Sequence, residues 1–161
     1  MPKISIIIVS FNTRSSLITC LKSLHKTPPE ISHEIIVVDN ASSDGTLEAL
    51  TNNWPDIRLL RLNKNFGFAA ATNKGIRRTS GELVLLLNSD TIVLRGSIDN
   101  LVAALTANPE VAIAGPRLLS RDGRLELSFG SMISPVSEVR QKLLNWSLNN
   151  NFRLLSYWVE K

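Results

Sequence analysis

The chain has 161 residues, of which 43% are hydrophobic and 20% charged, a composition typical of a soluble globular protein with enough residues for one α/β domain. The formal net charge of +4 and the pI near 9.6 indicate a mild attraction to anions, which nucleic acids, acidic lipids and phosphorylated metabolites all satisfy. The single cysteine excludes an intramolecular disulfide and a multi-cysteine zinc site, so a reducing compartment is expected.

The sequence shows no secretory or membrane-spanning signal. The apolar run of residues 4–9 is too short for the core of a signal peptide. No stretch approaches the roughly 20 apolar residues that a spanning helix needs. We therefore expect a cytoplasmic protein that acts in the cytosol or at the inner face of the membrane.

The first part of the chain alternates predicted strands with predicted helices. Residues 4–9 are mostly β-branched and apolar, which predicts a central strand. A helical stripe of apolar residues follows, formed by Leu17, Cys20, Leu21 and Leu24. Further strands are expected at residues 34–38 and 57–62. Between them lies a short helix with Leu47, Leu50 and Trp54 on one face.

The same alternation continues towards the C-terminus. Residues 69–78 form a predicted helix rich in small side chains, which suits close packing. The five apolar residues 83–87 predict a strand buried on both faces of a parallel sheet. The remaining predicted elements are a helix with Ile98, Leu101, Val102 and Leu105 on one face, a short strand at 111–114, and a hairpin turn at Asp122-Gly123.

Alternating strands and helices predict a three-layer α/β/α fold with a mostly parallel sheet. Three strands end in polar clusters, and in a parallel sheet these clusters lie along one edge, where ligands bind. One such residue alone, Asp90, would more often be a simple turn cap, but three converging clusters indicate a site. The clusters are Ser10-Phe11-Asn12, Asp39-Asn40 and Asn88-Ser89-Asp90.

Two common nucleotide-binding motifs are absent. The loop after the first strand contains no glycine, so the G-x-G-x-x-G signature of dinucleotide folds is missing, as is the P-loop signature. A diphosphate is expected to bind instead through a divalent cation, Mg²⁺ or Mn²⁺. Asp90, Ser89 and Asn88 offer the hard oxygen ligands that such a cation prefers.

The sequence resembles family 2 glycosyltransferases with the GT-A fold over roughly residues 4–130, and the block at residues 37–46 is highly specific. Similarity to the rhamnosyltransferase-like branch rests on Gly115-Pro116-Arg117-Leu118-Leu119 with Asp122-Gly123-Arg124. The segments that carry the family resemblance are residues 4–12, Val37-Val38-Asp39-Asn40-Ala41-Ser42-Ser43-Asp44-Gly45-Thr46, Asn65-Phe66-Gly67-Phe68 with Asn73-Lys74-Gly75, and Leu86-Leu87-Asn88-Ser89-Asp90.

The resemblance implies a role for individual residues. Asp90 would be the last acid of the family's Asp-x-Asp motif and would ligate the metal that bridges the donor diphosphate, with Asn88 in place of the first acid. Lys64 and Lys74 are more simply explained as solvated surface charges. The residues implied to bind the nucleotide sugar are Ser10, Phe11, Asn12 and Asp39 around a pyrimidine, then Asn65, Gly67, Asn73, Asn88 and Ser89.

Inverting sugar transfer also needs a general base, which the resemblance places in a later acidic motif that is not found here. None of the acids after Asp90 is a convincing base: Asp99, Glu110, Asp122, Glu126, Glu138 and Glu160. We therefore expect a donor-binding domain at residues 1–134, followed at 135–161 by a helical tail that begins an incomplete acceptor region. The aromatic and basic tail could pack on a missing region or make peripheral membrane contact.

Two functions remain open. The resemblance implies an enzyme that moves a sugar from a nucleotide diphosphate donor, with dTDP-rhamnose as one candidate, to a glycan or lipid-linked acceptor in polysaccharide or cell wall biosynthesis. The alternative is a nucleotide-sugar-binding remnant without turnover. A nucleic-acid partner is not expected, because the basic residues are scattered and the aromatic content of 6% provides no stacking platform.

Overall fold

The computed structural model describes residues 2–120, 122–126 and 142. The chain divides into two compact units, residues 1–102 and 103–161.

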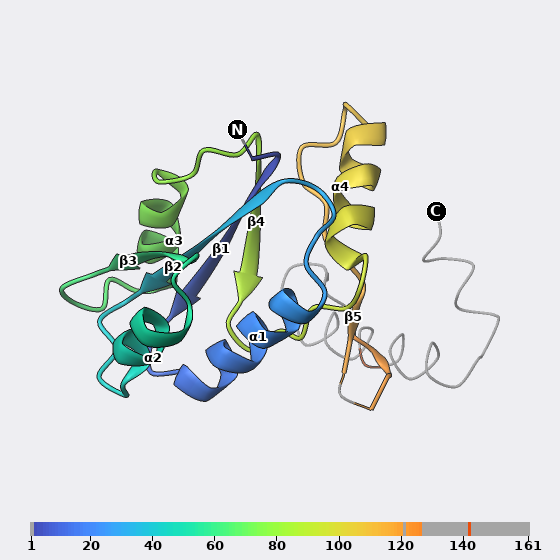
Figure 1. Ribbon diagram of the computed structural model, residues 1–161. Coiled ribbons are helices and arrows are strands. Elements are labelled where there is room, and N and C mark those ends of the chain that lie inside the picture. Colours follow the sequence, from blue (N-terminus) through green and yellow to red (C-terminus); the bar gives the residue numbers. More distant parts are fainter. Residues whose placement is uncertain (1, 121, 127–141, 143–161) are drawn as a thin grey trace. The chain divides into compact units, whose positions relative to one another are not determined.

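A four-stranded parallel sheet forms the centre of the first unit, in the order β3-β2-β1-β4 (Figure 1). The first strand lies between two others and is almost completely buried, so its predicted central position is confirmed. The register places Ser10 beside Asp39 and Val9 beside Asn88. The strands are β1 (Ile4–Ser10), β2 (His33–Asp39), β3 (Arg58–Arg61) and β4 (Leu83–Asn88).

Helices cover both faces of this sheet, which confirms the predicted three layers. Side chains of α1, α2 and α4 pack on the face that carries Ile4, Ile6 and Ile8. On the opposite face, α3 packs on Ile7 and Ile36. The helices are α1 (Arg14–Lys26), α2 (Thr46–Asn53), α3 (Phe68–Ile76) and α4 (Ser97–Ala107). The predicted stripe of α1 is fully buried: Leu17, Cys20, Leu21 and Leu24.

The close packing expected for α3 is present and depends on Gly75. A Cβ atom added at this glycine would lie 2.9 Å from Cγ2 of Ile7 and 3.0 Å from Cγ2 of Val38. Real Cβ atoms do not approach other carbon atoms this closely, so any larger residue would push the helix away from the sheet. Gly75 therefore sets the distance between α3 and strands β1 and β2.

The prediction that residues 83–87 are buried on both faces is wrong in the described structure. β4 is the edge of the sheet, and its residues alternate between half-buried and exposed. Leu83, Leu85 and Leu87 pack on the α1 face, whereas Val84 and Leu86 are 42% and 51% exposed. The physical reason is that α3 contacts β1 and β2 and does not cover β4. An apolar run alone does not indicate which neighbours cover it.

In the second unit, β5 (Leu118–Leu119) and β6 (Leu125–Glu126) form an antiparallel pair, as the Asp122-Gly123 turn predicted. The strand expected at 111–114 is wrong: this segment is irregular, and Ile113 is 87% exposed. The amide of Val111 bonds to the carbonyl of Asn108 in a turn instead of a ladder. The predicted tail at 135–161 and the domain boundary before it lie outside the described residues, apart from residue 142. Within the described ranges, no helix combines the length and apolarity required to cross a bilayer.

Candidate functional site

The three polar clusters converge at the carboxyl edge of the sheet, as expected from their positions after parallel strands. β2, β1 and β4 are neighbours, so the ends of all three strands lie side by side. The amide of Asn40 donates to the carbonyl of Ser10 at 2.8 Å, which extends the pairing of β1 and β2 one step past the strands. The sheet order thus assembles the candidate site from residues far apart in sequence.

A chain of hydroxyl groups joins the ends of β1 and β4. The Oγ1 atom of Thr13 lies 2.9 Å from Oγ of Ser10 and 3.2 Å from Oγ of Ser89. Thr13 is the N-cap residue of α1, but its side chain makes no capping bond to that helix. Its hydroxyl instead connects two predicted site residues, Ser10 and Ser89.

Asp39 is the most deeply buried acid of the site, with 1% of its surface exposed. Its Oδ1 atom accepts a hydrogen bond from the amide of Ser42 at 3.1 Å. Its Oδ2 atom is buried and has no hydrogen-bond partner. A buried acceptor without a partner costs about 1–3 kcal/mol, and such exceptions call for a functional explanation.

The loops after β1 and β2 are locked together by Asn12. The main-chain N–H of Asn12 donates to Oγ of Ser42, and its side-chain Oδ1 accepts a hydrogen bond from the main-chain N–H of Ser43 at 2.8 Å. Asn12 and Ala41 are the non-glycine residues with positive φ in the described structure, at 54° and 68°. A left-handed conformation is unfavourable for alanine and is kept only where surrounding contacts enforce it. The Asn12 side chain therefore positions the loop beside Asp39.

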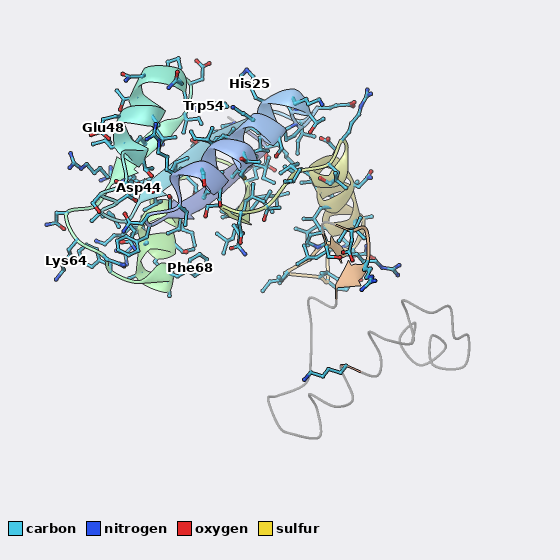
Figure 2. All side chains as sticks on the ribbon, turned by 90° about the horizontal axis from the view of Figure 1, so that it is seen from below. His25, Asp44, Glu48, Trp54, Lys64 and Phe68 are labelled. Carbon is cyan, nitrogen blue, oxygen red and sulfur yellow. The ribbon has the colours of Figure 1, made fainter. Side chains whose placement is uncertain are left out.

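Asp44 caps two helices at once. Its Oδ2 accepts the amide of Arg14 at the start of α1 at 2.9 Å, and its Oδ1 accepts the amide and hydroxyl of Thr46 at the start of α2. Burial raises the pKa of the Asp44 carboxyl, but the hydrogen bonds from Thr46 and Arg14 outweigh it and hold that pKa below its usual value. Asp44 is labelled in Figure 2 with Glu48 of α2.

A second polar network, centred on Asn40, fixes the loop between β3 and α3. Asn40 is 2% exposed. Its Nδ2 donates to Oδ1 of Asn65 at 2.8 Å, and its Oδ1 accepts the amide of Phe66 at 3.0 Å. Oδ1 of Asn65 also accepts the amide of Gly67. Two predicted site residues, Asn65 and Gly67, are thus tied directly to the residue that follows Asp39.

Two other predicted site residues lie outside these networks. Phe11, in the turn after β1, is 44% exposed, so its ring is accessible to a planar ligand. Asn73 lies on α3 between the buried residues Thr72 and Gly75, and its side chain is exposed to solvent. The structure thus joins Asn65 and Gly67 to the neighbour of Asp39 but leaves Asn73 apart from that network.

Asp90 lies at the end of β4, exposed to solvent. In the described part of the chain, its carboxylate has neither a hydrogen-bond nor an ion-pair partner, and no group of three His, Cys, Asp or Glu side chains gathers around a common point. Burial raises the pKa of the Cys20 thiol to about 11, and the negative charge of Asp90 contributes to this increase as the smaller cause. The oxygen atoms that Asp90, Asn88 and Ser89 carry are of the type that Mg²⁺ and Mn²⁺ prefer.

Two of the acids considered as bases have structural roles. Oδ1 of Asp99 accepts the amides of Glu30 and Ile31. The hydroxyl of Ser120, more than the nearby Arg124, holds the pKa of Asp122 below its usual value. Both carboxylates thus have hydrogen-bond partners within the described structure.

Two residues that organise the site, Thr13 and Asp44, were not predicted as site residues, and Asn40 was predicted only as a member of the polar cluster after the second strand. Each has a polar side chain within a few residues of the carboxyl end of a strand, the signal that identified their neighbours. Their partners lie 25 to 76 positions away in sequence, so their individual roles required the strand order.

Relatives of this chain are glycosyltransferases and polysaccharide biosynthesis proteins. The GalNAc(5)-diNAcBac-PP-undecaprenol beta-1,3-glucosyltransferase of Campylobacter jejuni is 32% identical over 148 residues, which cover 88% of this chain and 47% of that protein. The O-antigen biosynthesis protein RfbC of Myxococcus xanthus is 35% identical over 129 residues, covering 78% of this chain and 10% of RfbC. The chain thus spans less than half the length of these curated relatives.

Solved structures with the same fold contain nucleotide sugars. S. aureus TarS 1-349 in complex with UDP-GlcNAc has a TM-score of 0.59 at 25% identity, covering 66% of this chain and 32% of TarS. The mannosyltransferase PcManGT of Pyrobaculum calidifontis, in complex with GDP-Man and Mn²⁺, has a TM-score of 0.57 at 28% identity, covering 65% of this chain and 32% of that enzyme. These neighbours agree with the expected GT-A type of α/β fold.

The family itself is shown by a match along nearly the whole sequence. Residues 5–157 match the model of the family described as Glycosyl transferase family 2. This range includes every polar cluster at the carboxyl edge of the sheet. The chain belongs to glycosyl transferase family 2.

Proposed function

We propose that this chain binds the nucleotide of a sugar donor at the carboxyl edge of its sheet and transfers the sugar to a glycan or lipid-linked acceptor. The observation that carries the proposal is the buried Oδ2 atom of Asp39, which has no hydrogen-bond partner. Uracil or thymine in a nucleotide offers one ring N–H, and this donor matches one orphaned carboxylate oxygen. Because Oδ2 is shielded by the surrounding loops, a base that reaches it must shift them slightly.

The accessible ring of Phe11 and the neighbouring loops supply the rest of the proposed nucleotide site. A base held at Asp39 can stack on an exposed aromatic ring within the same edge. The Asn65–Gly67 loop borders the ribose or sugar from the β3 side, while Ser89 and Asn88 approach the diphosphate from the β4 side. TarS, which binds UDP and UDP-GlcNAc, supports a pyrimidine donor of this kind.

Asp90 is the proposed metal ligand. Its unpaired, exposed carboxylate, with the oxygens of Asn88 and Ser89, would hold Mg²⁺ or Mn²⁺ against the donor diphosphate. Such a cation stabilises the negative charge that develops on the leaving diphosphate. The complex of PcManGT with Mn²⁺ supports this arrangement by analogy. The donor sugar is proposed to be rhamnose, carried by dTDP, with inversion at the anomeric carbon.

Calorimetric titration tests the nucleotide site. We expect UDP and dTDP to bind in the presence of Mn²⁺, and EDTA to weaken that binding. Asp39→Asn should reduce the affinity by about 10- to 100-fold, because the amide group keeps an acceptor at only one of the two positions, so that one hydrogen bond to a charged group is lost. Asp90→Ala should abolish the dependence on metal. The control is Asp56→Asn, an exposed acid in the turn before β3. Equal affinity with and without metal would exclude the proposed role of Asp90.

A second candidate function is nucleotide-sugar binding without turnover. It is favoured by the roles of Asp99 and Asp122, which are occupied by hydrogen bonds within the fold. Incubation with radiolabelled dTDP-rhamnose or UDP-sugars and lipid extract discriminates the two candidates. Transfer or donor hydrolysis above background, lost in Asp90→Ala, establishes the enzyme and excludes the binding protein.

A further inference from the structure

The segment from residue 57 to residue 81 carries positive charge without any acid. It contains Arg58, Arg61, Lys64, Lys74, Arg77 and Arg78, and no Asp or Glu. In the fold this segment comprises the edge strand β3, the following loop, and α3, which packs on the face formed by β1 and β2. The fold brings cations of this segment together, since Nη1 of Arg58 donates to the carbonyl of Arg78 at 2.6 Å.

Most of these cations face solvent without a neutralising partner. Arg58, Lys64, Arg77 and Arg78 are exposed and Lys74 is half-buried. Within the described ranges, Arg58 reaches a carboxylate, that of Glu34 at 3.7 Å, while the other four form no ion pair. The register puts Arg58 on the α3 side of the sheet, since it pairs with Ile36. We call these five residues the basic face; they are Arg58, Lys64, Lys74, Arg77 and Arg78.

Phe66 lies within the basic face and brings two of its charges together. The ammonium groups of Lys64 and Lys74 lie 5.1 Å and 4.6 Å from the centre of the Phe66 ring. The two charges are thus within about 10 Å of each other, roughly one Debye length at moderate salt, and they repel. The ring compensates part of that repulsion through cation–π attraction. Phe66 remains 36% exposed and Phe68 is 59% exposed, so apolar rings accompany the charges.

The basic face lies outside two cavities among the described residues, of about 400 and 200 Å³. Together these cavities are lined by residues of α1, α2, β2, the turn before β3 and β3 itself, and none of the cations of the basic face lines them. Figure 2 shows Lys64 at the outer border of the first unit, away from the helices that enclose those cavities. The cations of the basic face are spread over β3, the following loop and α3, which suits an extended anionic surface better than a compact anion.

We propose that the basic face docks on an anionic lipid surface. Clusters of four to eight basic residues, with apolar rings between them, attract acidic headgroups. This inference rests on the proposed function, because a lipid-linked acceptor is presented at a membrane. The loop that carries Lys64 and Phe66 follows the carboxyl end of β3, and Asp39 lies at the carboxyl end of the neighbouring strand β2. Docking through this loop would therefore bring the nucleotide site to the bilayer surface.

Vesicle flotation with the full chain tests the proposal. The wild type is mixed with vesicles of phosphatidylcholine alone or with roughly a third phosphatidylglycerol. The test variant is Lys64→Gln/Lys74→Gln/Arg77→Gln. The control is Lys22→Gln/Lys26→Gln/Arg95→Gln, which removes three exposed charges elsewhere and gives the same net charge, +1 in place of +4. Each cation near an acidic surface contributes about fivefold to partitioning, so three contribute on the order of 100-fold at low salt.

We expect the wild type to float with the phosphatidylglycerol vesicles and to remain behind with phosphatidylcholine alone. The test variant should lose most of this binding, while the control loses only a few-fold. The proposal is overturned if the wild type does not distinguish the two vesicles, if both variants lose equally, or if single-stranded DNA binds more tightly than the acidic vesicles at physiological salt. UDP and dTDP titrations on the same proteins separate this result from the nucleotide site, since the basic-face variant should keep its nucleotide affinity.

Discussion

Replacing Asp44 should cost the protein a large part of its stability, because one carboxylate caps two helices. Asp44→Ala removes the acceptors of the Arg14 amide of α1 and of the Thr46 amide and hydroxyl of α2. No side chain within α1 replaces the first of these bonds, since Thr13 makes no capping bond. A lost N-cap costs about 0.5–2 kcal/mol, so the two together should cost about 2–3 kcal/mol.

Urea unfolding followed by circular dichroism measures this loss. With a slope of about 1–3 kcal/mol per molar for a small domain, the midpoint should fall by roughly 1–2 M. Glu48→Ala is the matched control, because Glu48 lies exposed in the first turn of α2 and interacts with that helix through its dipole alone. Its expected effect is below about 0.5 kcal/mol. Asp44→Ala within 0.5 kcal/mol of Glu48→Ala would refute the capping role.

The stabilisation by Asp44 also depends on pH. The pKa of Asp44 is lowered in the folded chain, so its contribution is fully present above the unfolded value of about 3.8 and is lost as pH falls through the folded value. Asp44→Asn should therefore be less stable than the wild type at pH 7, and the difference should shrink below pH 4. A difference in unfolding free energy between the two proteins that grows as pH falls would contradict the lowered pKa of Asp44.

Two further predictions follow from packing and from the amino edge of the sheet. Gly75→Val should lower the free energy of unfolding by about 1–3 kcal/mol, because its side chain meets Ile7 and Val38, while Gly115→Ala, with open space around it, stays within 0.5 kcal/mol; equal urea midpoints would contradict the packing. Glu34→Gln should cost about 1–2 kcal/mol at pH 7, since its Oε1 accepts bonds from Ser5 and Ser80. Burial raises the pKa of Glu34, but the bonds from Ser5 and Ser80 and the charge of Arg58 outweigh it and hold that pKa below its usual value. The stability difference should therefore begin to shrink as pH falls below about 4.5 and disappear as pH falls through the folded pKa, as urea midpoints across pH would record.

The strands and helices of the first unit follow from short-range sequence patterns. β1 and β2 lie within one residue of the bounds predicted from their apolar runs, and α1 contains the predicted stripe from Leu17 to Leu24. Residues 111–114 and 83–87 show where such short-range patterns do not suffice. Whether an apolar run forms a strand, and whether both of its faces are covered, depends on partners that the run itself does not specify.

In the candidate site, too, the positions of residues were predictable from local sequence, whereas their contacts were not. Position after a parallel strand was enough to select Ser10, Asp39, Ser89 and Asp90, because any parallel sheet brings such positions to one edge. The contacts between them were not predictable, since Asn12 meets Ser43 only because β1 and β2 are neighbours in register. Asn12 thus has a positioning role in the structure, beside the ligand contact that the family resemblance implies.

The hydroxyl chain Ser10–Thr13–Ser89 has a property that amide networks do not share. In both of its hydrogen bonds either oxygen can be the donor, so the chain exists in two directions that differ only by rotation of three O–H groups. A ligand that accepts a hydrogen bond at one end selects one direction and thereby sets whether the other end offers a proton or a lone pair. The ends of β1 and β4 can therefore influence one another without movement of the backbone.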